Sequence, residues 1–148
     1  MGNWTLDDIN WGAFDVSKAD LDTVRIIKAA SLVESNGDLY GRYLANVFDG
    51  DELFVAAAWQ WAREEVQHGE ALAKWSTLAD PGWNFDIART RFCEGYQQVD
   101  METASSVRGS RCAELIARCI VEVGTSSYYS ALADSTDEPV LKQICKQI

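Results

Sequence analysis

One Glu-x-x-His pair has the residue types and the spacing that metal chemistry needs. Glu65 precedes His68 by three residues, and His68 is the only histidine of the chain. On a helix these two side chains leave the same face and can converge on one ion. A buried carboxylate without a partner is costly, so the pair predicts a bound cation. Apolar residues continue the same helical stripe on both sides of the pair: Phe54, Ala58, Trp61, Leu72 and Trp75.

Two more acids lie in apolar stripes of the same kind. Glu34 is the only charged residue of its stripe, and Glu122 is the only one of another. We therefore predict four metal ligands, Glu34, Glu65, His68 and Glu122. Carboxylate oxygens combined with imidazole suit iron or manganese better than copper or structural zinc. The two stripes consist of Ile27, Ala30, Gly37, Gly41, Leu44 and Phe48 around Glu34, and of Leu115, Cys119, Tyr129 and Leu132 around Glu122.

Four helices are predicted to position these residues. Asp51-Glu52 at the start of the second helix and Pro139 at the start of the fourth are typical helix starts, and Asp49-Gly50 and Pro81-Gly82 end the first two helices. No segment alternates with period two, so no sheet is expected. The predicted helices span residues 20–48, 51–78, 110–133 and 139–148, with an N-terminal wrap over 1–19 and a crossover over 79–109.

The lengths of the connections predict the topology. Helices 20–48 and 51–78 are joined by a few residues, as are 110–133 and 139–148, so each pair forms an antiparallel hairpin. About thirty residues separate the two hairpins, enough to run the length of a bundle. Two hairpins joined by one long crossover form the ferritin-like four-helix bundle. We predict an all-α protein with one such domain over residues 1–148.

The fourth helix is expected to be incomplete. Its stripe of Leu141, Ile144 and Ile148 reaches the last residue before any acid is met. Glu65 follows Glu34 by 31 residues (65 − 34), and the same step from Glu122 also passes Ile148. If the two halves are pseudo-repeats, a second Glu-x-x-His would follow residue 148. The sequence then supplies four of the six ligands of a di-iron carboxylate bundle.

Composition narrows the class of protein. The 148 residues are 47% hydrophobic and 24% charged, with a net charge of −10 and a pI of about 4.4. This charge disfavours binding to nucleic acids or to anionic membranes. No apolar run reaches the ~20 residues of a membrane helix, and no secretory signal is visible, so we expect a cytoplasmic protein. The four cysteines lack CxxC spacing, which argues against a rubredoxin-type iron site.

Three short segments resemble the soluble acyl-ACP desaturases of the ferritin-like di-iron carboxylate superfamily. Glu65-Val66-Gln67-His68-Gly69, preceded by Glu64, resembles their E-E-N-R-H-G motif. Residues 141–148 resemble the Q-I-C-x-x-I segment that precedes their second ligand pair. Glu122 with Thr125 resembles their E-x-x-T, in which the glutamate binds iron and the threonine lies near the oxygen site. The family's chains are much longer, and its basic docking face for the carrier protein is not evident here.

The resemblance implies an O2-activating oxidoreductase that uses two iron ions or a manganese–iron pair. Its partners would be O2, an electron donor and a small or acyl substrate, and a homodimer is one option for its assembly. Two other interpretations remain open. The chain could be an iron-oxidising or iron-binding protein of the ferritin or rubrerythrin type. It could also be a metal-free bundle whose buried acids pair with arginines.

Overall fold

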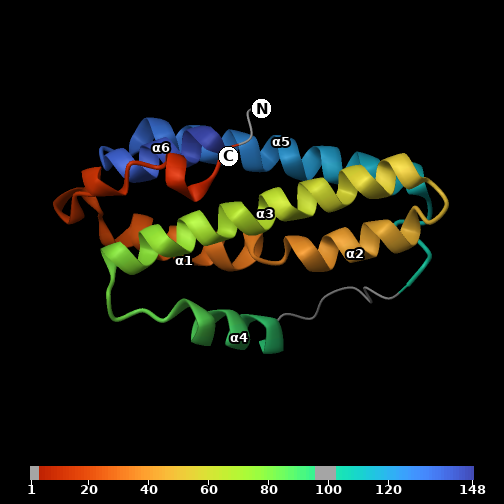
Figure 1. Cartoon of the computed structure of the whole chain (residues 1–148), viewed down its shortest axis with the longest axis horizontal. Helices are drawn as coiled ribbons and strands as arrows, with labels where there is room; N and C mark the ends of the chain where they lie inside the picture. Colours follow the sequence, from red (N-terminus) through yellow and green to blue (C-terminus); the bar gives the residue numbers. More distant parts are fainter. Residues whose placement is uncertain (1–3, 96–102) are drawn as a thin grey trace.

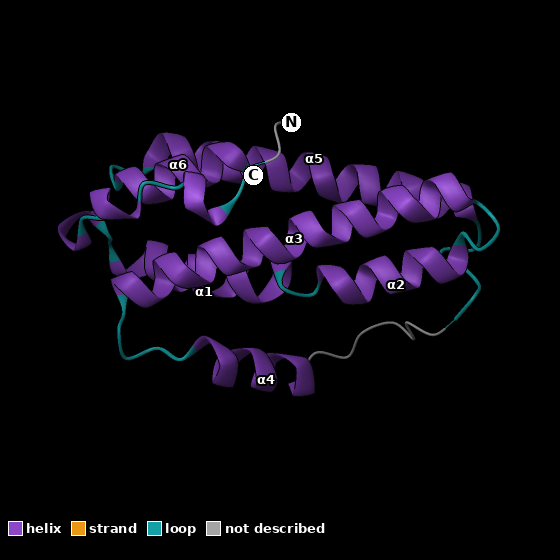
Figure 2. Ribbon diagram, viewed as in Figure 1, coloured by secondary structure: helices purple, strands orange, loops and turns teal. Residues whose placement is uncertain are grey.

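The fold is entirely helical in the part of the chain that the structure describes. The computed structural model describes residues 4–95 and 103–148, and no strand occurs in these ranges (Figure 2). The predicted all-α class is confirmed. Three 3-10 turns come first, at Leu6–Asp8, Trp11–Ala13 and Val16–Lys18. The longer helices are α1 (Leu21–Glu34), α2 (Gly37–Val47), α3 (Glu52–Ala79), α4 (Phe85–Gly95), α5 (Arg111–Ser135) and α6 (Pro139–Gln147).

The helix predicted over residues 20–48 is wrong in one respect, because it is divided into α1 and α2. The Ser35 hydroxyl donates to the Ser31 carbonyl, and the Asn36 amide donates to the Leu32 carbonyl at 2.9 Å. At the same point the Asn36 backbone amide donates to the Val33 carbonyl at 3.1 Å, three residues back instead of four. Side-chain bonds of this kind favour local distortion of a helix. Both helices still pack along one side of α3, end to end (Figure 1). Glu34 is therefore the last residue of α1 rather than a mid-helix residue.

Side-chain caps fix where the other helices start. Asp51 accepts a hydrogen bond from the Phe54 amide at the start of α3, and Ser110 accepts one from Ala113 at the start of α5. Glu138 caps α6, whose first residue is Pro139. Such caps satisfy amides that have no partner within the helix. The observed bounds of α3, α5 and α6 lie within two residues of the predicted ones.

The crossover carries a helix of its own, α4, on the outer side of α1 (Figure 1). The Arg89 guanidinium donates to the Ser35 carbonyl at 3.1 Å and so ties α4 to the corner between α1 and α2. The predicted crossover over 79–109 also includes residues 96–102, which lie outside the described residues.

Helix α5 is oriented differently from the prediction. Leu115 is 38% exposed and Cys119 is also exposed, although both were predicted to face inward. Glu114 is fully buried instead. Its carboxylate accepts hydrogen bonds from the Tyr43 hydroxyl at 2.7 Å and from the Arg108 guanidinium at 2.8 Å. These polar partners from α2 and the crossover turn Glu114 inward and its apolar neighbour outward.

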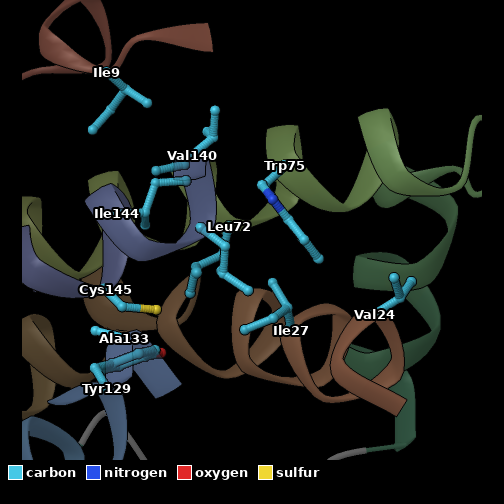
Figure 3. Close-up of a cluster of buried hydrophobic side chains, with 12 residues drawn as sticks. Ile9, Val24, Ile27, Leu72, Trp75, Tyr129, Ala133, Val140, Ile144 and Cys145 are labelled. Carbon is cyan, nitrogen blue, oxygen red and sulfur yellow. The ribbon is translucent and has the colours of Figure 1, made fainter. Parts of the chain in front are cut away.

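The main hydrophobic cluster joins α1, α3, α5 and α6 at one end of the bundle (Figure 3). Ile27, Leu72, Trp75 and Ile144 are each 0% exposed. Burying side chains of this size stabilises the fold by about 1.5–3 kcal/mol each. The cluster holds the end of α1 against α3, close to Glu34. Among the described residues, no helix combines the length and apolar character of a membrane span.

Candidate metal site

Three of the four predicted ligands lie together between α1 and α3. Glu34 ends α1, and Glu65 and His68 lie in the middle of α3. Each residue offers one ligand atom: a carboxylate oxygen from each glutamate and a nitrogen from the imidazole. These three atoms lie within 4.8 Å of one another. All three side chains are buried or half-buried. Atoms at these separations can bind one ion after only small side-chain rotations.

Two glycines let the helices approach closely at this point. A Cβ atom on Gly37 would lie 2.5 Å from the Glu65 Cβ and 2.7 Å from the Ala62 carbonyl oxygen. A Cβ atom on Gly69 would lie 2.5 Å from the Ser35 hydroxyl and 2.8 Å from the Ser35 nitrogen. Only glycine fits at such contacts. The corner between α1 and α2 thus packs directly against the turn of α3 that carries Glu65 and His68.

His68 has a buried nitrogen with no partner. Its Nδ1 has no hydrogen-bond partner and lies 3.6 Å from the Glu65 Oε1. The ring of Trp4 stacks parallel to the imidazole, with 5.9 Å between ring centres. The Gln67 side-chain amide donates a hydrogen bond to the Trp4 carbonyl oxygen at 2.8 Å. Buried polar atoms without a partner are rare and costly, so Nδ1 is a candidate for binding an ion.

The two carboxylates resist ionisation in the metal-free protein. Burial, with the neighbouring carboxylate, raises the pKa of Glu34 to about 8, and burial raises that of Glu65 to about 7. Burial also lowers the pKa of His68 and raises that of Glu122. Desolvation favours the neutral form of every group in the site. A bound cation would favour the ionised carboxylates instead.

Arginine does not neutralise these acids directly. In residues 4–95 and 103–148, no lysine or arginine forms an ion pair with Glu34, Glu65 or Glu122. Arg118 lowers the pKa of Glu65 and Glu122 electrostatically. Its guanidinium packs over the Tyr40 and Trp61 rings, 4.9 and 5.7 Å from their centres. The arginine pairs that the metal-free interpretation predicts are therefore not present among the described residues.

Glu122 and Thr125 lie on α5, outside the three-residue cluster. Glu122 is half-buried and interacts electrostatically with Glu34, Glu65 and His68, but it is not among the ligand atoms within 4.8 Å. The Thr125 hydroxyl donates to the Val121 carbonyl at 2.8 Å, one turn earlier in its own helix. A role for Thr125 in oxygen binding therefore stays a prediction.

Sequence patterns did not reveal two contributors to the site. The Tyr129 hydroxyl donates a 2.6 Å hydrogen bond to the Glu34 Oε1, and Tyr129 is 1% exposed. The sequence predicted only that Tyr129 packs in the core. Trp4 could not be placed either, because a residue near the chain start has no periodic relation to α3. The only signal for Tyr129 is its stripe position, seven residues after Glu122.

The metal-free protein should lose stability as pH rises from 6.5 to 8.5. In the folded protein Glu34 and Glu65 are still largely protonated at pH 6.5 and lose their protons by about pH 8.5, whereas an unfolded glutamate has already ionised near pH 4.5. Raised carboxylate pKa values stabilise the fold below pH 4.5, and this contribution is lost as pH passes the folded values. Burial lowers the pKa of His68 below its ordinary value of 6.5, so this residue opposes the loss slightly near pH 6.5 and has no effect well above it. We expect a loss of about 2 kcal/mol.

Urea denaturation with a chelator at pH 6.5 and 8.5 measures this loss. The Glu34→Gln/Glu65→Gln variant is the control, because neither side chain can ionise. Its free energy of unfolding should depend much less on pH. The same pH dependence in both proteins would show that other groups cause it.

Comparisons with known proteins assign no family. No family model matches the chain, and no curated protein or solved structure shows significant similarity to it. The candidate site therefore depends on the geometry described above. Its central features are three ligand atoms within 4.8 Å of one another, an imidazole nitrogen without a partner and two carboxylates with raised pKa values.

Proposed function

We propose that this protein is a ferritin-like bundle that binds iron or manganese between α1 and α3 and serves as an O2-activating oxidoreductase. Glu34, Glu65 and His68 would hold the ion, and Glu122 would take part from α5. The observation that carries the proposal is the convergence of three ligand atoms within 4.8 Å of one another. The hairpins α1–α2–α3 and α5–α6, joined by the crossover with α4, fit the connectivity of such bundles.

The residues present fit a divalent transition metal. Two carboxylate oxygens and one imidazole suit iron or manganese, whereas thiolates would favour zinc or copper(I). The unpartnered Nδ1 of His68 lies 3.6 Å from the Glu65 Oε1. The Tyr129 hydroxyl holds one oxygen of Glu34 at 2.6 Å. Hydrogen bonds of this kind orient a metal-binding carboxylate.

The metal would supply the redox chemistry with O2, and the chain would supply ligands, a dry site and control of access. The N-terminal segment contributes to this control, because Trp4 covers His68. Only the resemblance to the desaturase motifs supports an acyl or small organic substrate, an electron donor and a second metal ion. Iron oxidation without an organic substrate is the second candidate function, since it would need the same ligands.

Metal content per chain tests the proposal. The protein is loaded with Fe(II) or Mn(II) without oxygen, passed over a desalting column and analysed for metal. We expect at least one ion per chain for the native sequence and a loss of more than ~10-fold in affinity for Glu65→Ala and His68→Ala. Glu70→Ala is the matched control. It replaces an exposed acid of the same helix and should bind like the native protein.

Two outcomes would distinguish the alternatives. Equal metal content in the native protein and all of these variants would exclude the site, and absence of metal from all of them would favour a metal-free bundle. If metal binds as expected, O2 consumption by the Fe(II)-loaded protein separates the two metal-dependent functions. Uptake of many irons per chain with continued O2 consumption would favour iron oxidation over an oxidoreductase with an organic substrate.

A further inference from the structure

Trp4 is the aromatic neighbour of the candidate ligand His68. The indole and imidazole planes differ by only 5°, and 5.9 Å separates the ring centres. Parallel rings at this separation are offset-stacked, an arrangement that aromatic pairs favour. Trp4 precedes His68 by 64 residues (68 − 4), so the stack joins the N-terminal segment to the middle of α3.

The imidazole of His68 has no hydrogen bond to orient it in the metal-free protein. In most metal sites the second ring nitrogen of a histidine ligand donates to a carboxylate or a carbonyl, and this bond fixes the ring. Within residues 4–95 and 103–148, neither nitrogen of His68 has a hydrogen-bond partner. The 3.6 Å between Nδ1 and the Glu65 Oε1 is too long for one. Packing must therefore set the orientation of the ring, and Trp4 supplies a flat face for it.

Hydrogen bonds hold the N-terminal segment in the place that this stack requires. The Gln143 side chain on α6 donates to the Asp8 carbonyl and accepts from the Asn10 amide, each at 2.9 Å. The Gln67 side chain donates to the Trp4 carbonyl at 2.8 Å. Gln67 directly precedes the histidine, so the same turn of α3 binds the backbone of Trp4 and stacks against its ring.

We propose that Trp4 is a positioning residue for the metal site, whose indole holds the His68 imidazole with Nδ1 on the side of Glu65. Gln67 keeps Trp4 in place. This role rests on the proposed function, because it requires an ion that His68 binds. A ring that is already oriented loses little freedom when it binds an ion, and such preorganisation strengthens binding. The stacked indole thus takes over the task that a hydrogen bond performs in other histidine sites.

Titration with Mn(II), followed by the EPR signal of the free ion, tests the role. Trp4→Ala should weaken Mn(II) binding by about 10-fold, as expected when a group that orients a ligand is lost. Trp4→Phe should restore most of the affinity, because a phenyl ring can stack in the same way. Trp83→Ala is the matched control and should bind like the native protein. Trp83 is a half-buried tryptophan that packs on Phe85 and Lys28, between α3 and α4.

Gln67→Ala gives a second and milder test that leaves the Trp4 ring in the chain. Loss of one hydrogen bond to the Trp4 carbonyl should weaken Mn(II) binding by about 3-fold. Gln60→Ala is its matched control, because Gln60 is an exposed glutamine of the same helix whose partners are Glu64 and Arg63. It should not change the affinity.

Proton NMR of the metal-free protein tests the orientation of the ring directly. His68 is the only histidine, so its two carbon-bound ring protons give one isolated pair of signals. Stacking on the indole should shift these signals through the ring current. Trp4→Ala should move them toward the positions of a free histidine, whereas Trp83→Ala should leave them unchanged. A tryptophan that only stabilised the fold would not affect them in this selective way.

The outcomes separate this role from the proposed function. If the native protein binds Mn(II) and Trp4→Ala binds it equally well, the role of Trp4 is excluded and the metal site stands. Weaker binding in Trp4→Ala with unchanged His68 signals, or without recovery in Trp4→Phe, would also exclude it, because the ring would not be what acts. A native protein that binds neither Mn(II) nor Fe(II) would overturn the proposed function and this role with it.

Discussion

Replacement of Glu138 by alanine should destabilise the fold by about 5 kcal/mol. Glu138 is fully buried, and its carboxylate accepts three hydrogen bonds. The donors are the Trp75 indole at 2.6 Å, the Leu141 amide at 2.7 Å and the Asp15 amide at 3.1 Å. A buried donor left without a partner costs about 1–3 kcal/mol, and the cavity adds to this loss.

These three bonds connect separate parts of the fold. Trp75 belongs to α3, Leu141 to the first turn of α6, and Asp15 to the N-terminal segment. Loss of the carboxylate should therefore release α6 and the N-terminal segment before the α1–α3 pair. Urea denaturation gives the total loss, and hydrogen exchange at α6 amides gives its location.

Asp137→Ala is the matched control for this prediction. Asp137 is the adjacent acid, but it is exposed. Its replacement should change the free energy of unfolding by less than about 0.5 kcal/mol. If Glu138→Ala were as mild as Asp137→Ala, the carboxylate would not be the connection between α6, α3 and the N-terminal segment.

The sequence predicted the features that depend on local patterns. Asp51, Ser110 and Pro139 start helices because caps and first-turn proline act on the neighbouring backbone. Glu34 and His68 were found because each interrupts an apolar stripe. A stripe residue keeps its face even when the helix is divided, so the inner faces of α1 and α2 still match the prediction.

Features that depend on distant partners were not predictable. Glu114 turns inward because Tyr43 and Arg108 reach it from other segments, and this rotates Leu115 outward. The division at Ser35 and Asn36 was missed for a different reason: their partners are local, but serine and asparagine also occur inside unbroken helices. The position of a polar side chain with non-local partners follows from the fold, not from its neighbours in the sequence.

Gly37→Ala should destabilise the protein by about 3 kcal/mol and weaken metal binding by at least ~10-fold. Alanine favours helix formation over glycine by up to about 1 kcal/mol. Here the clash outweighs that gain, because the new Cβ would lie 2.5 Å from the Glu65 Cβ and 2.7 Å from the Ala62 carbonyl. Neither atom is at the end of a flexible side chain, so α2 must move away from α3. Glu34, three residues earlier, would move with it.

Gly124→Ala separates the clash from the general effect of alanine. Gly124 is inside α5, and a Cβ added there meets no atom within 4 Å. This variant should be about 0.5–1 kcal/mol more stable than the native protein and should bind metal normally. Urea denaturation and metal titration of both variants make the comparison. If Gly37→Ala kept full metal affinity despite its lower stability, the close packing of α2 on α3 would not be what positions Glu34. The ion would then have to be bound by α3 and other residues.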